Sequence, residues 1–166
     1  VMVASLVYTG ASARRLECPG DHVCAVESLV RRAAAKGAEL IVAPEYSLPQ
    51  TESESEGPVG ARPRDPSMPL QTRFSALADE LDVYLVINLE TRSAQRSYNT
   101  QVAFDDQGTL VARHHKFELF EGERQTLAAG NDVSAFDTPF GRVGLLICAD
   151  IYGDLERHTA LVHDKG

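Results

Sequence analysis

The sequence predicts an α/β domain in which helices pack on a mixed sheet, and three observations support this fold class. Short apolar runs alternate with amphipathic helical stripes over residues 1–89. Two pairs of short apolar strands follow, each pair joined by a polar connection that contains glycine. The chain has 166 residues, 43% of them hydrophobic, which suits one domain with a substantial core. We therefore expect strand, helix, strand, helix, strand and then hairpins in a single domain, residues 1–166.

The first segment, residues 1–9, is apolar and precedes four small residues at 10–13. This order superficially resembles the apolar region and cleavage site of a signal peptide, but no basic segment precedes it. We interpret it as a first buried strand. The next element is a helix, with Asp21 as its N-cap and Gly37 just beyond its end. Its apolar stripe comprises Val26, Leu29, Val30, Ala33 and Ala34.

Residues 39–43 are too short and too rich in branched side chains for a buried helix, so they predict a buried strand. Residues 46–67 carry an acidic run and several prolines, which are typical of a loop. We interpret this loop as a solvated insertion, and a lid over a site is the alternative. A second helix should follow, with Pro69 in its first turn, where the missing N–H costs nothing. Its apolar stripe comprises Leu70, Phe74, Leu77, Ala78 and Leu81.

The remaining elements are predicted to be strands. A buried strand covers residues 83–89, and a hairpin joins residues 99–104 to 109–115 through the polar connection 105–108. A second hairpin joins residues 133–137 to 142–148.

Composition and charge exclude several classes of function. There are 16 basic and 24 acidic residues, and the resulting net charge of −8 argues against nucleic acid as a partner. The longest apolar stretches, such as 40–44 and 143–148, fall far short of the ~20 residues that span a bilayer. Cys18 and Cys24 are close enough to form a disulfide, which would indicate an oxidising compartment, or they are two free thiols. Both interpretations stay open.

Three reactive side chains stand at the ends of predicted strands: Glu45, Lys116 and Cys148. Strand ends are where open α/β sheets form their sites. Each residue alone has an ordinary structural explanation, because cysteines are often buried and charged side chains are often solvated. Together they supply what amide cleavage by a thiol needs, since a thiol with a pKa of about 8.5 requires a neighbouring base at neutral pH.

Two blocks, residues 98–123 and 140–151, resemble the carbon–nitrogen hydrolase (nitrilase) superfamily, and within it the vanin and biotinidase branch. Residues 37–45 and 71–88 extend the resemblance more weakly. It implies an α-β-β-α sandwich with a mixed sheet. Because the chain ends soon after Cys148, we expect it to be the N-terminal portion of that fold.

The resemblance also implies roles for individual residues. Glu45 is the expected general base, Lys116 the electrostatic stabiliser and Cys148 the nucleophile. Glu123 matches a second acidic position that orients substrate and lysine, and the alternative is a surface charge on a polar loop that also carries Glu118 and Glu121. The backbone N–H of Ala149 is the expected oxyanion donor. No metal or organic cofactor is implied.

Two departures from the vanin and biotinidase pattern concern the substrate. Tyr46 stands where an acidic residue is usual, and Glu118 stands where asparagine is usual. Pantetheine or biotin amides are therefore candidates among small-molecule amides. The alternatives are a noncatalytic fragment or degenerate member that acts through association, and acyl transfer to an amine. The resemblance further implies a homodimer or higher homo-oligomer and favours an extracellular or periplasmic location.

Other constellations predict no site. His114 and His115 point to opposite faces of a strand and so do not bind a metal together. Cys18 and Cys24, with the nearby His22, lack a fourth ligand at zinc spacing. We expect Asp150 and Asp154 to hydrogen-bond the turn after the nucleophile, and the short acidic run at 52–56 to be solvated.

Overall fold

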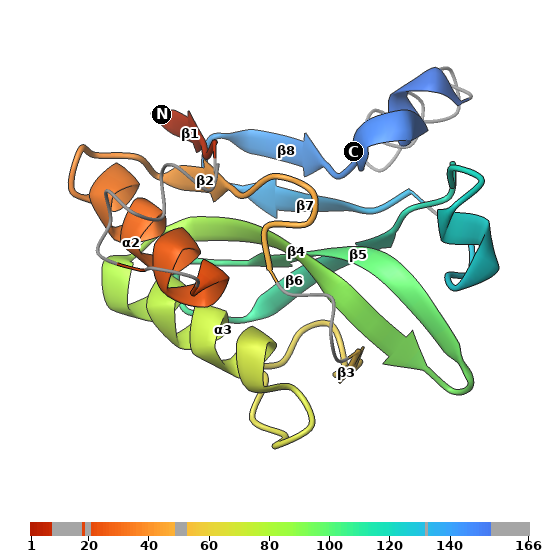
Figure 1. Ribbon diagram of the computed structural model, residues 1–166. Helices are drawn as coiled ribbons and strands as arrows, with labels where there is room; N and C mark the ends of the chain where they lie inside the picture. The colour runs from red at the N-terminus through yellow and green to blue at the C-terminus, as the bar shows by residue number, and fades with distance from the viewer. Residues whose placement is uncertain (8–17, 19–20, 49–52, 132, 154–166) are drawn as a thin grey trace.

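The computed structural model describes residues 1–7, 18, 21–48, 53–131 and 133–153, and it has a mixed sheet with two helices on one face (Figure 1). The sheet strands are β1 Val3–Ser5, β2 Leu40–Val42, β3 Glu54–Ser55, β4 Tyr84–Ser93, β5 Arg96–Phe104 and β6 Leu110–His115. The helices are α2 His22–Ala34 and α3 Pro69–Leu81. A separate hairpin comprises β7 Ala135–Thr138 and β8 Gly141–Gly144, and two 3₁₀ turns are η1 Glu123–Gln125 and η2 Cys148–Tyr152. Among the described residues, no helix is long and apolar enough to cross a membrane.

The strand order is β1-β2-β4-β5-β6, with β3 also paired to β4. β1, β2 and β4 run parallel because α2 and α3 return the chain to the same edge. β5 and β6 are antiparallel additions. The predicted α/β class with a mixed sheet is therefore confirmed.

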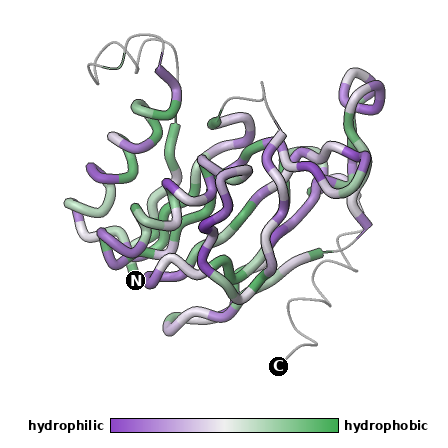
Figure 2. Tube along the Cα trace, turned by 90° about the horizontal axis from the view of Figure 1, so that it is seen from below, coloured by the Kyte–Doolittle hydropathy of each residue, from purple (hydrophilic) through white to green (hydrophobic). Residues whose placement is uncertain are grey.

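Two apolar cores lie on opposite faces of the sheet. On one face, α2 and α3 bury side chains such as Val30 and Phe74 against Ile41 and Leu85. On the other face, Phe136 and residues near it pack on alternate positions of the same strands, as the side-chain period of two requires. Hydrophobic and hydrophilic segments accordingly alternate along the trace in Figure 2. The sheet is thus the middle layer between helices and the β7–β8 hairpin (Figure 1).

The two helices differ in how their N-termini are capped, α2 by a neighbouring residue and α3 by a residue distant in the sequence. Asp21 caps α2 as predicted, accepting a hydrogen bond from the backbone N–H of Cys24 at 2.9 Å. α3 begins at Pro69 without a side-chain cap from its own N-cap residue. Instead the carboxylate of Glu54, on β3, accepts from the N–H groups of Leu70 and Gln71. The remote carboxylate satisfies donors that the first helical turn leaves free.

This contact corrects the interpretation of residues 46–67 as a solvated insertion. Glu54 is only 4% exposed and Glu56 is hydrogen-bonded to Thr91, so at least this part of the acidic run is folded onto the sheet. Its carboxylates are held by donors from α3 and β4 rather than by water. Residues 49–52 lie outside the described part of the chain.

Three other predictions about strands were wrong in detail. β1 is an edge strand, and Val1, Met2 and Val3 are exposed rather than buried; residues 8–9 lie outside the described part. β4 continues past its predicted end to Ser93 and turns directly into β5 through Ala94. β8 ends at Gly144, because after Leu145 the chain leaves the hairpin and turns into η2.

The open question about the two N-terminal cysteines is also answered. Cys18 and Cys24 form a disulfide, which leaves Cys148 as the free cysteine of the chain.

Candidate active site

The structure brings three of the predicted site residues together at one end of the sheet. Glu45 follows β2, Lys116 follows β6 and Glu123 begins η1. The ammonium Nζ of Lys116 lies 2.7 Å from Oε1 of Glu45 and 2.9 Å from both carboxylate oxygens of Glu123. Glu45 and Lys116 are 71 positions apart in the chain, so only the sheet topology makes them neighbours.

The lysine is fixed by its backbone and its burial. Lys116 N–H donates to the carbonyl of Asn99 on β5, and its own carbonyl accepts from Gly130, both at 2.9 Å. A side chain at Gly130 would clash with the carbonyl of His115, so only glycine permits this approach. The Lys116 side chain is 1% exposed, and its ammonium also lies 5.1 Å from the centroid of the Phe120 ring.

The ionisation of this cluster follows from its hydrogen bonds. Burial opposes charge on Lys116, but the hydrogen bonds from its ammonium to Glu123 and Glu45 outweigh burial and raise its pKa. Burial likewise opposes charge on Glu123, but donors from Lys116, Tyr46 and the backbone of Phe120 lower its pKa to about 2. A buried cation therefore sits between two carboxylates, and Lys116 stays protonated throughout the neutral range.

Cys148 opens η2 with a positive φ of 46°, a left-handed conformation that few non-glycine residues adopt. Such strained positions cluster at functional sites, where the surrounding contacts hold them. Cys148 is exposed, and its thiol lies near enough to the Glu45 carboxylate and the Ala149 N–H for both to influence its pKa. Burial of the sulfur and the negative charge of Glu45 raise the pKa of Cys148, against the opposing charge of Lys116. The resting cysteine is therefore a neutral thiol beside a base.

Asp150 links the turn that contains Cys148 to residues 114–118 around Lys116. Its Oδ1 accepts from the N–H groups of Phe117 and Glu118 at 3.1 and 2.9 Å. Its Oδ2 accepts from the N–H of Ile147 at 2.9 Å and contacts Nε2 of His114 at 2.8 Å. The prediction that Asp150 hydrogen-bonds its own turn is confirmed. The structure adds its link to residues 114–118 around Lys116. Asp154 lies outside the described residues.

The two histidines point to opposite faces, as predicted. His114 is buried against Asp150, whereas His115 is half-buried against Glu56 and stacks on Tyr98. Within the described ranges, no group of His, Cys, Asp and Glu is arranged to hold a metal ion.

Sequence reasoning missed Asn99, which contacts this cluster, and Asn88, which lies behind Asn99. It considered Tyr46 only as a departure that concerns the substrate. Asn99 donates through Nδ2 to Oε1 of Glu45 at 2.8 Å and to Oε1 of Glu123 at 3.2 Å. The hydroxyl of Tyr46 donates to Glu123. For the two asparagines the sequence did hold a signal, because each is an amide at an inward-facing position of an apolar strand. Burying a polar group there without a hydrogen-bond partner costs free energy.

Comparisons with known proteins show which family the chain belongs to. Residues 22–164 match the model of the carbon–nitrogen hydrolase family. The chain belongs to this family. It is 34% identical over 155 residues to a mouse pantetheinase, an alignment covering 76% of this chain and 30% of that protein. It is 33% identical over 147 residues to the human omega-amidase NIT2, covering 79% of this chain and 50% of that protein. The chain therefore spans about a third to a half of these relatives.

Solved structures support the same fold. The nitrilase-superfamily protein Nit3 of Saccharomyces cerevisiae superposes with a TM-score of 0.66 at 26% identity, covering 79% of this chain and 50% of that one. An amidase from Nesterenkonia superposes with a TM-score of 0.63 at 19% identity, which supports the fold alone. The expected nitrilase-type architecture is thus confirmed.

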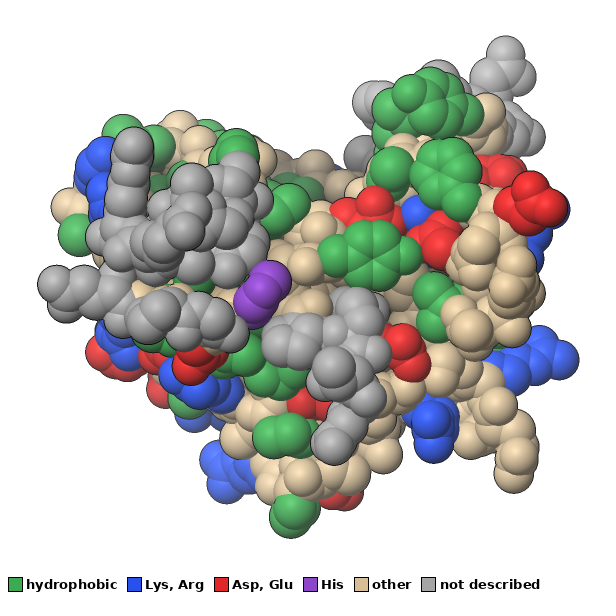
Figure 3. Space-filling view, in the orientation of Figure 1, with side chains coloured by type: hydrophobic (Ala, Val, Ile, Leu, Met, Phe, Trp, Pro, Cys, Tyr) green, Lys and Arg blue, Asp and Glu red, His purple; other side chains and the backbone are tan. Residues whose placement is uncertain are grey.

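This member of the carbon–nitrogen hydrolase family exposes hydrophobic side chains around the charged cluster of Glu45, Lys116 and Glu123. Tyr46, Phe120, Ile151 and Tyr152 are 44 to 83% exposed. Figure 3 shows hydrophobic side chains gathered beside acidic and basic ones on the face in view. The face around Cys148 therefore offers apolar contacts to a bound molecule as well as charge.

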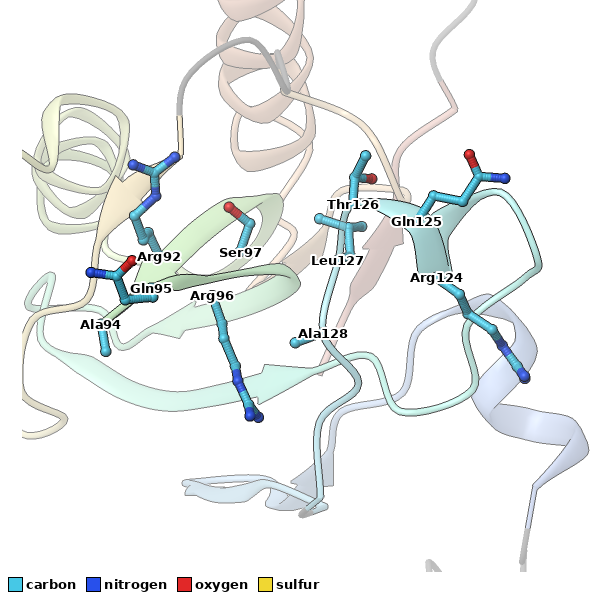
Figure 4. Close-up of a pocket in the computed structure, with 10 residues that line it drawn as sticks. All are labelled: Arg92, Ala94, Gln95, Arg96, Ser97, Arg124, Gln125, Thr126, Leu127 and Ala128. Atoms are coloured by element: carbon cyan, nitrogen blue, oxygen red, sulfur yellow. The ribbon is translucent and has the colours of Figure 1, made fainter.

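A polar pocket of about 540 Å³ lies elsewhere, between the β4–β5 turn and the segment 124–128. Its lining includes Arg92, Arg96 and Arg124, but Figure 4 shows these side chains pointing in different directions rather than toward a common point. Arg124 donates to the carbonyl of Leu119. The pocket includes none of the predicted catalytic residues, so we assign it no part in the chemistry.

Proposed function

We propose that the protein hydrolyses a non-peptide amide bond through a thioester on Cys148, with Glu45 as general base and Lys116 as electrostatic stabiliser. The observation that carries this proposal is the position of the Glu45 carboxylate, which contacts the Lys116 ammonium at 2.7 Å and lies near enough to the Cys148 thiol to raise its pKa. A base, a buried cation and an accessible thiol thus share one small site. No cofactor takes part in the proposed reaction.

The first step uses the neutral thiol. Glu45 removes the Cys148 proton as the sulfur attacks the amide carbonyl, so an S–C bond forms and the π electrons move to oxygen. Lys116 and the Ala149 N–H stabilise that oxyanion. One such donor typically contributes about 2.7 to 4 kcal/mol to lowering the barrier. Collapse breaks the C–N bond, and the proton held by Glu45 passes to the departing amine.

The second step releases the acid. Glu45 removes a proton from water as the water oxygen attacks the thioester carbonyl. Collapse of the intermediate breaks the bond between the acyl carbon and Cys148 Sγ, the free acid departs, and the Cys148 sulfur takes the proton back from Glu45. Glu123 does not exchange protons in this scheme, because its pKa of about 2 keeps it ionised. Its role is to hold the Lys116 ammonium in place and charged.

For the substrate we propose a pantetheine-type amide. Relatives named pantetheinase share 34% identity with the chain, and the exposed Phe120 and Tyr152 provide apolar contacts for an extended acyl chain. Tyr46 and Glu118 depart from the vanin pattern, so biotin amides and the short ω-amides suggested by the omega-amidase relatives belong in the same test panel.

The deciding experiment is mass spectrometry of the intact protein mixed with pantetheine, biotin amides or ω-amides, together with product analysis. We expect an acyl adduct on Cys148 and release of the free acid, both lost in Cys148→Ala. Turnover that survives Cys148→Ala would refute the proposal. Transfer of the acyl group to an added amine in place of water would instead show acyl transfer. A folded chain with neither adduct nor product would favour the noncatalytic alternative.

Two properties of the whole protein are also proposed. We propose a homodimer or higher homo-oligomer, supported by the exposed apolar side chains of Val3 on edge strand β1 and of Met2 just before it, to be tested by light scattering. We propose an oxidising, extracellular or periplasmic compartment, supported by the Cys18–Cys24 disulfide.

A further inference from the structure

Two buried asparagines lie directly beneath the charged cluster, Asn88 on β4 and Asn99 on β5, and both are fully buried. Asn88 is two positions from Val86, and Asn99 is four positions from Ala103. Val86 and Ala103 face the β7–β8 side of the sheet, so both asparagines face that side as well. This is the face on which the proposed active site lies.

The orientation of the Asn88 amide is set by two backbone groups. The N–H of Tyr46 approaches one end of Asn88 at 2.8 Å, so that end must be the accepting Oδ1. The carbonyl of Thr100 approaches the other end at 3.1 Å, so that end must be the donating Nδ2. Neither backbone group can exchange roles, and Asn88 is therefore locked in one orientation.

This orientation propagates to Asn99. Asn88 Nδ2 also donates to Oδ1 of Asn99 at 2.8 Å, which turns the Nδ2 of Asn99 toward the carboxylates of Glu45 and Glu123. A chain of hydrogen bonds therefore runs from the Tyr46 N–H through the two asparagines to the Glu45 carboxylate. The two amide side chains that form it are uncharged. It joins the backbone of the turn after β2 to the Glu45 carboxylate, which projects from the same turn.

These contacts determine which oxygen of Glu45 is available to accept the Cys148 proton. Lys116 and Asn99 both donate to Oε1 of Glu45, at 2.7 and 2.8 Å. With Oε1 engaged twice, Oε2 is the oxygen left to accept the Cys148 proton. We propose that Asn99 is a positioning residue that holds Glu45 in this orientation and, through Asn88, couples it to its own turn. The inference rests on the proposed function, because it assigns Glu45 its proton-accepting atom.

The test compares Asn99→Leu and Asn99→Ala with wild type, using full-length protein whose folding is checked by circular dichroism. Gln101→Leu is the matched control: Gln101 is a buried amide on the same strand and face, and its Oε1 has no hydrogen-bond partner among the described residues. Two rates are measured against pH: alkylation of Cys148 by chloroacetamide, and kcat/KM for the amide that wild type turns over.

Removing a donor from a carboxylate favours its protonated form. We therefore expect the acidic limb of both profiles to move to higher pH by about one unit in the Asn99 variants, as loss of one charge-assisted hydrogen bond predicts. Both plateau rates should fall about ten-fold or more because the base is no longer oriented. Gln101→Leu should match wild type.

If folded Asn99 variants gave pH profiles with the acidic limb and the plateau rate of wild type, the inference would be overturned, whether or not the enzyme turns over an amide. A purely structural role would lower stability without moving the limb. If wild type is alkylated but hydrolyses no amide, the hydrolase proposal fails while the alkylation profile still decides the role of Asn99.

Discussion

Replacing Asp150 with asparagine should strongly destabilise the protein. The carboxylate is fully buried and accepts hydrogen bonds from three backbone N–H groups, besides its 2.8 Å contact with His114. Asparagine keeps one accepting oxygen and places an NH₂ group against donors that the second oxygen served. Breaking a buried, charge-assisted network of this kind costs about 3 to 5 kcal/mol. We therefore expect Asp150→Asn to lower the free energy of unfolding by that amount.

Urea denaturation at pH 7 measures this loss. Asp137→Asn is the matched control, because Asp137 is on β7 with its side chain 77% exposed. It should change stability by less than about 0.5 kcal/mol, as surface substitutions usually do. An Asp150→Asn loss below about 1 kcal/mol would refute the reasoning, since it would mean that the network contributes no more than one ordinary hydrogen bond.

The pH dependence gives a second check on Asp150. Burial alone would raise its pKa, but hydrogen bonds from His114 and from the backbone of Glu118 and Ile147 outweigh it and lower the pKa. A lowered pKa means that the carboxylate stabilises the fold above its unfolded value of about 3.9 and loses this contribution as pH falls through the folded value. The stability gap between wild type and Asp150→Asn should therefore shrink in acid. A gap that widens below pH 4 would contradict this assignment.

Three further predictions follow the same logic. Glu54→Ala should cost about 1 to 2 kcal/mol in urea denaturation, the loss of a helix cap, and a change under 0.5 kcal/mol would show that α3 does not need this remote carboxylate. Thiol titration of the native protein should detect one reactive cysteine, Cys148, and three after reduction and unfolding, whereas three under native conditions would contradict the disulfide. Glu123→Gln should lower the free energy of unfolding at pH 7. Because the Glu123 pKa is about 2, the difference in stability from wild type should persist down to about pH 4.5 and vanish toward pH 2. A difference that is already lost at pH 6 would be inconsistent with the Lys116 contact.

The helices and most strands were predictable because their signals are local. The apolar stripe and the Asp21 cap specified α2, and Pro69 marked the first turn of α3. The hairpin of β5 and β6 followed from its polar connection, whose Gly108 has a φ of +71°. β3 was missed because a two-residue strand in an acidic, proline-rich stretch has no periodicity to detect.

The site was predictable to a different degree. Glu45, Lys116 and Cys148 stood out because reactive side chains followed apolar runs and matched a family pattern, and the structure brings them together. Cys148 nevertheless lies in a 3₁₀ turn with a positive φ rather than at a strand end. The asparagines were missed because an amide within a strand looks like any polar residue until its partners are known.

The local elements, the acidic net charge, the family pattern and the residue types available for chemistry could all be predicted from the order of the amino acids. Which groups meet became visible only in the folded chain: Asn99 with Glu45 across 54 positions, Asp150 with the backbone of Glu118, and Glu54 with the start of α3. The physical reason is that periodicity and capping act within a few residues. Buried polar groups, in contrast, must be satisfied by whichever donors the packed sheet and turns place beside them.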